Sequence, residues 1–372
     1  MAEMYVRIDE PRHHCRSMRI DDPGRWPRQL VQPVCILRSG HDASTYNCKR
    51  AGTRLASLLR HDRAALEQHL GLHGSQCYLR SFKKVRSVAA TSDPPLLIID
   101  GDNLAHRAYH SMPKSLRSDD GRPINAIVGW TNMLVTLWDN EQPRSIFVAW
   151  DTLGVDTYRH KLWPTYQGGR VFDNAIVRQL DLLPTLAAAF GFGVGKKPGY
   201  EADDFMAAAA IAETRRGGRS LLLTTDRDAY QLVSDSVTVL APRSGVRDLI
   251  RVGPEQVVER MGVLPEQVAD FKALAGDASD NIPGAKGIGP KAAAALLLKY
   301  GTLESVLEAR ADTIAQATAA QLRVFKQIVS MKPEELEVSL PATAPPNWEN
   351  AAKRLHELGA HNLAERVATR AA

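Results

Sequence analysis

Three short apolar runs that end in aspartate constrain the fold of this chain most. They span residues 95–101, 145–151 and 220–226, with Asp100, Asp151 and Asp226 at or next to their ends. Segments with helical periodicity lie between them, and a shorter strand is expected at 192–196. Buried strands that alternate with helices build a mostly parallel sheet covered on both faces. We therefore predict an α/β fold with a mostly parallel central sheet flanked by helices.

The three aspartates are expected at one edge of this sheet. In open α/β sheets, ligand sites lie outside the carboxyl ends of the strands. A single aspartate in this position is most often a turn or cap residue. Three of them at the same edge, with Asp228 close behind the last, favour a shared site instead.

A further acidic cluster precedes an alanine-rich helix expected at 201–214. Residues 199–204 read Gly-Tyr-Glu-Ala-Asp-Asp, so three carboxylates fall within the first turn. The helix dipole alone favours acids there. Together with the strand-end aspartates, and with Asp277 and Asp280 in a loop rich in glycine and proline, the cluster predicts a site for hard cations.

Two other segments carry features of nucleic-acid contact. Residues 158–170 are basic and aromatic, which suits either a solvated loop or a segment that contacts phosphates and bases. Residues 276–291 contain Pro-Gly-x-x-Gly-x-Gly between predicted helices at 265–275 and 292–300. Backbone amides of such a hairpin, with the following helix N-terminus, can hold a phosphate. A single helix is expected at 173–189, kinked at Pro184.

The first 92 residues differ in composition from the rest. They carry 16 Lys and Arg against 8 Asp and Glu, a net charge of +8. Since the whole chain has a net charge of +5, residues 93–372 carry −3. Apart from leucines at helical spacing in 54–72, they lack a core pattern, and we expect a disordered basic extension. A DNA-attracting tail and a misassigned start codon both remain open explanations.

Composition excludes several other classes of protein. No apolar run is long enough for a membrane span, and the N-terminus does not resemble a signal peptide. The four cysteines are unevenly spaced without a Cys-x-x-Cys pair, which favours reduced thiols over a zinc site. No Ser-His-Asp or Cys-His arrangement is recognisable. We expect a cytoplasmic, nucleoid-associated protein that is a monomer and needs no small-molecule cofactor.

From about Pro94 to Leu307, the chain resembles the bacterial and phage 5′–3′ exonuclease, or flap endonuclease, family. Members of this family also form the N-terminal module of many bacterial DNA polymerases I. The motifs that carry the resemblance are Ile99-Asp100-Gly101 with Arg107, Trp150-Asp151, Gly199 to Asp204, Thr225-Asp226-Arg227-Asp228, and Gly276 to Asn281. No polymerase domain follows, so the sequence resembles a stand-alone paralogue.

The resemblance implies a PIN-like nuclease core that binds two or more Mg²⁺ or Mn²⁺ ions. It assigns metal binding to Asp100, Asp151, Glu201, Asp203, Asp204, Asp226, Asp228, Asp277 and Asp280. Asp100, Glu201, Asp203 and Asp226 are expected to form the inner part of the site. The order of the others stays open.

The same resemblance implies residues that contact DNA. Arg107 matches a basic residue near the scissile phosphate, and Tyr166 to Arg170 matches the Tyr-Lys-x-x-Arg of an arch through which the 5′ strand passes. Gln167 stands where the family has lysine, and Arg159, Lys161 or Arg170 is expected to compensate. The glycine-rich segment resembles a helix-three-turn-helix that grips duplex DNA and can hold K⁺. Its candidate contacts are Gly284, Lys286, Gly287, Gly289 and Lys291.

The expected domains are the extension at 1–92, the nuclease core at 93–252 with its arch near 158–175, a helix-hairpin-helix-type region at 253–333 and a helical tail at 334–372. The expected activity is metal-dependent hydrolysis of DNA at 5′ flaps or 5′ ends in replication and repair, with RNA–DNA hybrids as further candidate substrates. Two alternatives stay open: a PIN-like ribonuclease and a non-catalytic binder of branched DNA. The glycine-rich hairpin and the intact acids disfavour both.

Overall fold

The computed structural model describes residues 93–169, 173–310, 314 and 316–371. By its internal contacts the chain divides into Met1–Ala90 and Thr91–Ala372, and the description concerns the second unit. The predictions of a basic extension, of a helix at 54–72 and of reduced thiols concern residues outside the described ones. So does the prediction for Arg170.

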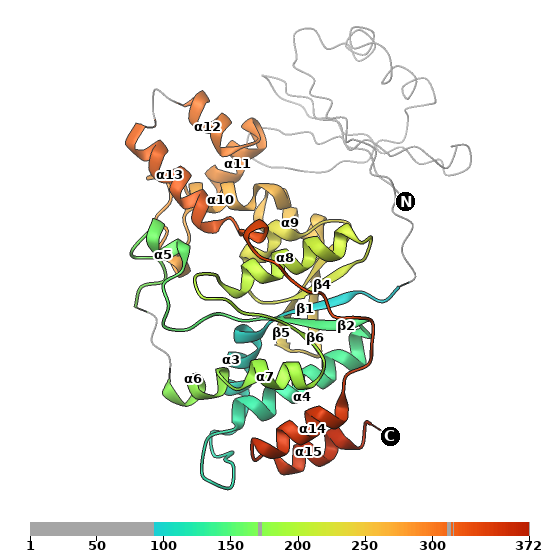
Figure 1. The fold of residues 1–372 in the computed structure, drawn as a ribbon. Coiled ribbons are helices and arrows are strands. Elements are labelled where there is room, and N and C mark those ends of the chain that lie inside the picture. Colours follow the sequence, from blue (N-terminus) through green and yellow to red (C-terminus); the bar gives the residue numbers. More distant parts are fainter. Residues whose placement is uncertain (1–92, 170–172, 311–313, 315, 372) are drawn as a thin grey trace, which may run out of the picture. The chain divides into compact units, whose positions relative to one another are not determined.

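A six-stranded sheet with the order β3-β2-β1-β4-β5-β6 forms the centre of the described unit (Figure 1). Five strands are parallel, and β6 runs antiparallel to β5. The strands are β1 (Leu96–Asp100), β2 (Ser145–Ala149), β3 (Gly193–Gly195), β4 (Ser220–Leu223), β5 (Val237–Gly245) and β6 (Asp248–Val252). The predicted mostly parallel sheet is confirmed. The β5–β6 hairpin was not predicted.

Side chains of the central strands alternate between two hydrophobic cores, one on each face of the sheet. In β1, Leu96 and Ile98 belong to the first core, whereas Leu97 and Ile99 belong to the second. All four are fully buried. Successive strand residues point to opposite faces, so an uninterrupted apolar run fits a strand covered on both sides.

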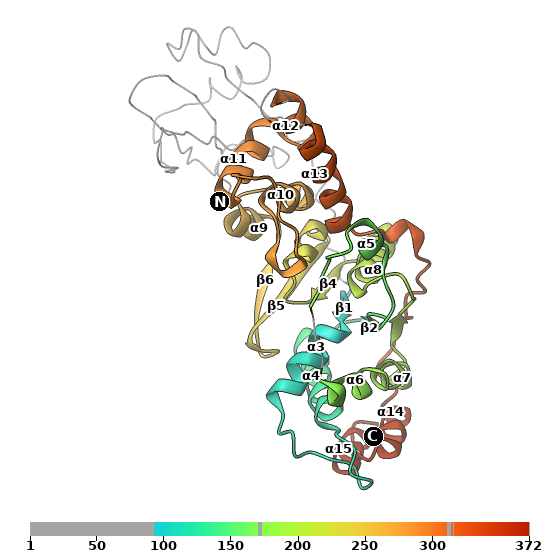
Figure 2. The ribbon, with the colours of Figure 1, turned by 90° about the vertical axis from the view of Figure 1, so that its left-hand side faces the viewer.

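Helices from the first half and from the end of the chain cover the second core (Figure 2). The predicted single helix at 173–189 is instead two helices. Leu183–Ala189 begins anew with Pro184 in its first turn, where proline is tolerated, after a turn at Asp181 and Leu182. The helices on this face are α3 (Gly101–Ser111), α4 (Asn125–Glu141), α6 (Asn174–Leu180), α7 (Leu183–Ala189), α14 (Trp348–Glu357) and α15 (His361–Ala368).

The first core joins the sheet to the C-terminal helical region. Phe205 and Met206 of α8 lie in the same cluster as Leu274, Leu297 and Phe325, which come from three later helices. The helices on this side are α8 (Ala202–Arg215), α9 (Pro254–Met261), α10 (Val268–Ala275), α11 (Pro290–Tyr300), α12 (Leu303–Ala309) and α13 (Gln316–Val329). In the arch segment, α5 (Tyr158–Leu162) is a short helix.

The C-terminal helices α14 and α15, in the predicted tail at 334–372, pack into the second hydrophobic core. Trp348, Ala351 and Leu355 of α14 are buried in the second core, and Trp348 packs edge-on against Phe190 after α7. The sequence showed helical patches here but no partner for them. No helix in the described ranges combines the length and apolar character that a membrane span requires.

Candidate active site

The candidate site lies where the strand order reverses. From β1 the chain moves outward to β2 and β3, then returns to β4 on the other side of β1. Asp100 ends β1, Asp151 follows β2, and Asp226 follows β4. This is the switch point at which open parallel sheets bind ligands. The predicted convergence of the three aspartates at one edge follows from this topology.

Asp100 is held in place by two hydrogen bonds. Its side chain caps α3 by accepting from the Asn103 amide at 3.0 Å, and its second oxygen accepts from the Thr224 hydroxyl at 3.0 Å. Burial raises the pKa of Asp100 to about 7, and the charges of Asp151 and Asp226 add to this effect. A pKa this high indicates that the ionised Asp100 side chain is poorly stabilised by its surroundings. A bound cation would supply the positive charge that stabilises it.

Asp102 is a site residue that sequence reasoning missed. It is nearly buried and accepts a hydrogen bond from the Asp151 amide at 2.8 Å, which fixes the loop after β2. Burial, and then the charge of Asp151, raise its pKa. The second aspartate of Asp100-Gly101-Asp102 was the only signal in the sequence.

Asp204 does not fit the prediction that it binds metal. Its side chain is fully buried and accepts hydrogen bonds from the Tyr158 hydroxyl at 3.0 Å, the Lys332 amide at 2.9 Å and the Arg159 guanidinium at 2.8 Å. A further bond comes from the Glu201 amide at 3.1 Å. Within the described part of the chain, Oδ1 thus accepts from three donors and Oδ2 from two, so neither oxygen of Asp204 keeps a lone pair for a cation.

Glu201 and Asp203 are more suited to a cation. One oxygen of Asp203 accepts from Arg159 at 2.9 Å, whereas its Oδ1 is buried and has no hydrogen-bond partner among the described residues. Glu201 accepts from the hydroxyls of Thr157 and Tyr166, each at 3.1 Å. Burial raises the pKa of Glu201 to about 7 and that of Asp203 well above its usual range. Both groups thus resemble oxygen ligands without their cation.

Arg159 and Tyr166 were expected to contact DNA, and the structure corrects both expectations. The Arg159 side chain is 1% exposed and contacts Glu201, Asp203 and Asp204. Tyr166 is 4% exposed. A basic and aromatic segment is typical of a surface, but these two side chains contact the acid cluster instead. Lys161 of the same segment is exposed, and its contact with DNA stays a prediction.

Lys272 is a second cation that the sequence did not reveal. It forms ion pairs with Asp228 and with Asp277, the latter at 2.6 Å. Burial alone would raise the pKa of Asp277, but the Lys272 charge and hydrogen bonds lower it. In the sequence, Lys272 is one residue of the apolar helix Val268–Ala275, and nothing there marked it as a partner of the acids.

Gln167 links the arch segment to the loop of Asp277 and Asp280. Its amide nitrogen donates to Asp280 at 3.1 Å and to the Tyr166 hydroxyl at 2.8 Å. Its backbone is left-handed, with φ of 49°. Burial first, and then the charges of Asp277 and Asp226, raise the pKa of Asp280. A residue predicted to act at the phosphate is thus joined to the acids.

The acidic side chains of the described residues do not form a complete metal-binding site. Within the described ranges, no group of three or more His, Cys, Asp or Glu side chains is arranged closely enough to hold an ion. Arg159 and Lys272 neutralise part of the cluster instead. The Asp203 oxygen that has no partner in the described part of the chain, and the raised pKa of Asp100 and Glu201, still fit the donor set of a divalent cation.

The glycine-rich hairpin leads from α10 into α11, which begins at Pro290. Lys286 and Lys291 are exposed, as are Gly287 and Gly289. Gly284 has φ of 69°, and a Cβ there would lie 2.4 Å from the Gly276 amide nitrogen. Arg107 lies half-buried on α3, two turns after Asp100. The predicted DNA contacts of this hairpin and of Arg107 remain predictions.

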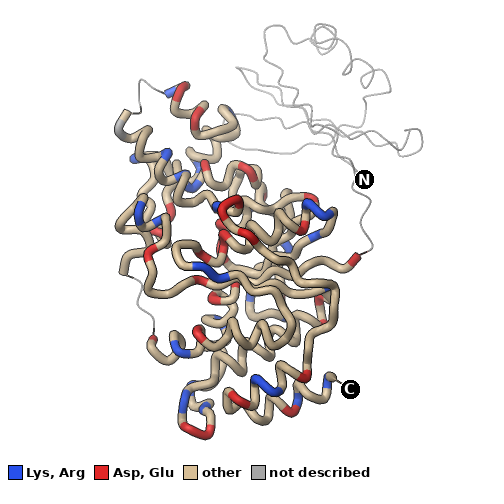
Figure 3. Tube along the Cα trace, in the orientation of Figure 1, with Lys and Arg blue, Asp and Glu red and all other residues tan. Residues whose placement is uncertain are grey.

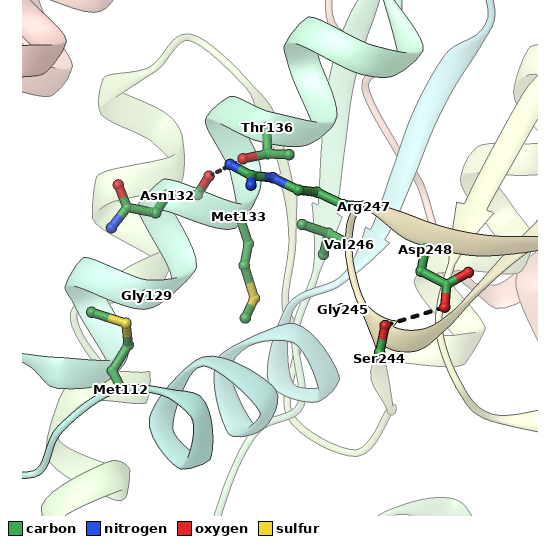
Figure 4. Close-up of a pocket in the computed structure, with 10 residues that line it drawn as sticks. All are labelled: Met112, Gly129, Asn132, Met133, Thr136, Ser244, Gly245, Val246, Arg247 and Asp248. Atoms are coloured by element: carbon green, nitrogen blue, oxygen red, sulfur yellow. Dashed lines mark hydrogen bonds between the residues drawn. The ribbon is translucent and has the colours of Figure 1, made fainter.

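Acidic and basic positions are interspersed along the described trace (Figure 3). A separate hollow of about 380 Å³ lies between α4 and the β5–β6 hairpin, with Met112, Met133 and Val246 among its lining residues (Figure 4). None of the predicted site residues lines this hollow.

Two family models match adjacent parts of the chain. Residues 95–262 match the N-terminal resolvase-like domain of 5′–3′ exonucleases, and residues 263–352 match their C-terminal SAM fold. Together they cover the sheet, the acids and the glycine-rich hairpin. The second match ends within α14.

Curated relatives are bacterial DNA polymerases I. The chain is 42% identical over 217 residues to DNA polymerase I of Mycobacterium tuberculosis, which covers 58% of this chain and 24% of the relative. It is 32% identical over 288 residues to the Bacillus subtilis enzyme, covering 74% of this chain and 32% of that protein. The matched part therefore spans about a quarter to a third of these relatives.

Solved structures show the same fold. A bacteriophage T5 5′-exonuclease with bound zinc ions aligns with a TM-score of 0.52 at 20% identity, covering 74% of this chain and 97% of that one. The T5 D15 flap endonuclease in a pseudo-enzyme-product complex with DNA and metal ions aligns with a TM-score of 0.50. The predicted fold and family are confirmed: this chain belongs to the 5′–3′ exonuclease family.

Proposed function

We propose that this protein is a divalent-metal-dependent nuclease that hydrolyses DNA at 5′ ends and at the base of 5′ flaps. The observation that carries this proposal is the mutual electrostatic contact of five acids near the switch point of the sheet, in a member of this family: Asp100, Asp151, Glu201, Asp203 and Asp226. The T5 relatives were solved with metal ions, one of them with DNA, which supports the same chemistry here.

The chain's own residues would share the work as follows. Asp100, Glu201, Asp203 and Asp226 would hold Mg²⁺ or Mn²⁺, with Asp151 and Asp280 able to act through water. When bound, such cations supply an activated water and charge relief at the phosphate. Burial of Asp100 and Glu201 then strengthens their electrostatic interactions. No side chain has to form a covalent intermediate.

Positioning of DNA would fall to the exposed cations. Arg107 is placed two turns along α3 from Asp100 and could neutralise a phosphate near the acids. Lys161, Lys286 and Lys291 are exposed and suit backbone phosphates. Amides of the hairpin at Gly287 and Gly289 would grip the duplex, with K⁺ as a candidate ion there. We propose action as a monomer beside the nucleoid.

The test compares substrates with and without Mg²⁺ or Mn²⁺. Labelled 5′-flap DNA, blunt duplex, an RNA–DNA hybrid and single-stranded RNA are each given to the purified full chain. We expect metal-dependent cutting at the flap base, with Asp226→Asn about 10–100-fold slower. Asp226 is exposed, so its replacement should leave the fold intact.

The matched control is Asp139→Asn, which removes another aspartate whose side chain is 44% exposed but whose partner is Arg370 at the end of the chain. This variant should cut like the wild type. Preference for single-stranded RNA would favour the PIN-like ribonuclease instead. Flap binding without cutting would favour a non-catalytic binder of branched DNA.

A further inference from the structure

Arg159 occupies an unusual position for an arginine, since it is buried among the acids of the candidate site. Its Nη2 reaches Asp203 Oδ2 at 2.9 Å, and its Nη1 reaches Asp204 Oδ2 at 2.8 Å and lies 3.6 Å from Glu201 Oε2. Its Nε donates to the Ile328 carbonyl at the end of α13, at 2.9 Å. The guanidinium is thus fixed on all sides, by three carboxylates and one backbone carbonyl.

The contacts of Arg159 divide the three carboxylates into two classes. Asp204 is saturated, because the guanidinium and other donors take both of its oxygens. Asp203 is bound through Oδ2, and its Oδ1 is left buried without a partner among the described residues. Arg159 approaches Glu201 on the Oε2 side, which Tyr166 also bonds, whereas within the described ranges Oε1 accepts one hydrogen bond, from the Thr157 hydroxyl, and keeps a lone pair for a cation. The arginine therefore contacts one oxygen of each candidate ligand.

We propose that Arg159 is a positioning residue. It orients Asp203 and Glu201 so that Oδ1 of Asp203 and Oε1 of Glu201 face a divalent cation. The inference rests on the metal-dependent function proposed above. Asp204 is the anchor that holds the guanidinium, together with the Ile328 carbonyl. For this role the planar guanidinium, with its fixed N–H directions, matters more than the positive charge. A lysine ammonium cannot bond several carboxylates in a fixed geometry.

Arg144 provides a matched control elsewhere in the fold. It is also a buried arginine, bonded through Nε and Nη2 to Glu213 at 3.0 and 2.6 Å and through Nη1 to the Pro341 carbonyl at 2.7 Å. It precedes β2, so it lies at the amino end of the strands, opposite the acids. Arg144→Lys and Arg159→Lys both keep the charge and lose the fork, but only the second touches candidate ligands.

The test measures Mn²⁺ binding by calorimetry, without DNA, for the wild type and for both lysine variants. We expect Arg159→Lys to raise the Mn²⁺ dissociation constant at least about tenfold, as changes behind metal ligands do. Arg144→Lys should leave it unchanged even where it lowers the denaturation midpoint. Equal Mn²⁺ affinity in Arg159→Lys and the wild type would overturn this inference alone. Absence of Mn²⁺ binding by the wild type would overturn the proposed function as well.

A second measurement needs no substitution, and decides the question where Arg159→Lys does not fold. Mg²⁺ is titrated into ¹⁵N-labelled wild-type protein while the arginine Nε–H resonances are followed by NMR. The Arg159 resonance should shift as its carboxylates are shared with the cation, and the Arg144 resonance should not. An Arg159 signal that stays in place while Mg²⁺ binds would refute the positioning role.

Discussion

Replacing Asp100 with asparagine should stabilise the metal-free protein at high pH. In the unfolded chain this carboxyl loses its proton near pH 3.8, whereas burial holds its pKa at about 7 in the folded state. Between these values the folded protein binds a proton that the unfolded chain has released, so the free energy of unfolding falls as the pH rises. Asparagine carries no charge and avoids this loss.

The raised pKa of Asp100 sets the size of the expected gain in stability. Each pKa unit corresponds to about 1.4 kcal/mol, so ionised Asp100 costs the folded protein about 4 kcal/mol at pH 8. The asparagine oxygen can still accept from the Asn103 amide, but its NH₂ group cannot accept from the Thr224 hydroxyl, which costs about 1 kcal/mol. We therefore expect a net gain of about 2–4 kcal/mol at pH 8 and none at pH 4.

Urea denaturation in EDTA at pH 4, 6 and 8 measures this difference. Asp173→Asn is the control, because Asp173 also caps a helix but its pKa is lowered, chiefly by the Tyr109 hydroxyl. That variant should lose stability at pH 8 instead of gaining it. Saturating Mg²⁺ should abolish the advantage of Asp100→Asn. A variant no more stable than the wild type at pH 8 in EDTA would refute the idea that Asp100 is a buried charge awaiting a cation.

Three further predictions concern other parts of the site. Lys272→Met leaves two carboxylates without their shared cation and should cost about 3–5 kcal/mol in urea denaturation, part of it recovered with Mn²⁺; an unchanged midpoint would contradict this role. Gln167→Lys should speed single-turnover flap cutting about tenfold by adding a cation beside the acids, whereas a slower variant would show that the glutamine bonds matter more. Gly287→Ala should cost about 1–2 kcal/mol for its positive φ alone, and Gly284→Ala clearly more, because its Cβ would meet backbone; equal costs would argue against this packing.

The fold was predictable because its signals are local. Apolar runs such as 95–101 are typical of buried parallel strands, and their carboxyl ends meet by topology alone. The β5–β6 hairpin and the partner of α14 were not predictable in this way. The first depends on pairing across a turn with a register shift near Pro242 and Gly245. The second depends on contacts between residues far apart in the sequence.

The acids of the site were predicted by type, but their roles depend on contacts that no motif encodes. Asp203 and Asp204 are neighbours in the sequence, yet among the described residues one Asp203 oxygen has no partner, whereas both Asp204 oxygens accept from several donors. Arg159 looked like a DNA contact because a basic segment suggests a surface. Its burial follows from a short helix that turns it toward the acids and toward the end of α13.

The most direct test of the account is the position of a bound cation. Crystals of the protein grown with Mn²⁺ would be measured at the manganese absorption edge, and an anomalous difference map would locate the ions. We predict a peak in contact with Asp203 Oδ1 and Glu201, at the carboxyl ends of β1 and β4 near Asp100. Ordered Mn²⁺ elsewhere, with no peak among these acids, would contradict the central claim.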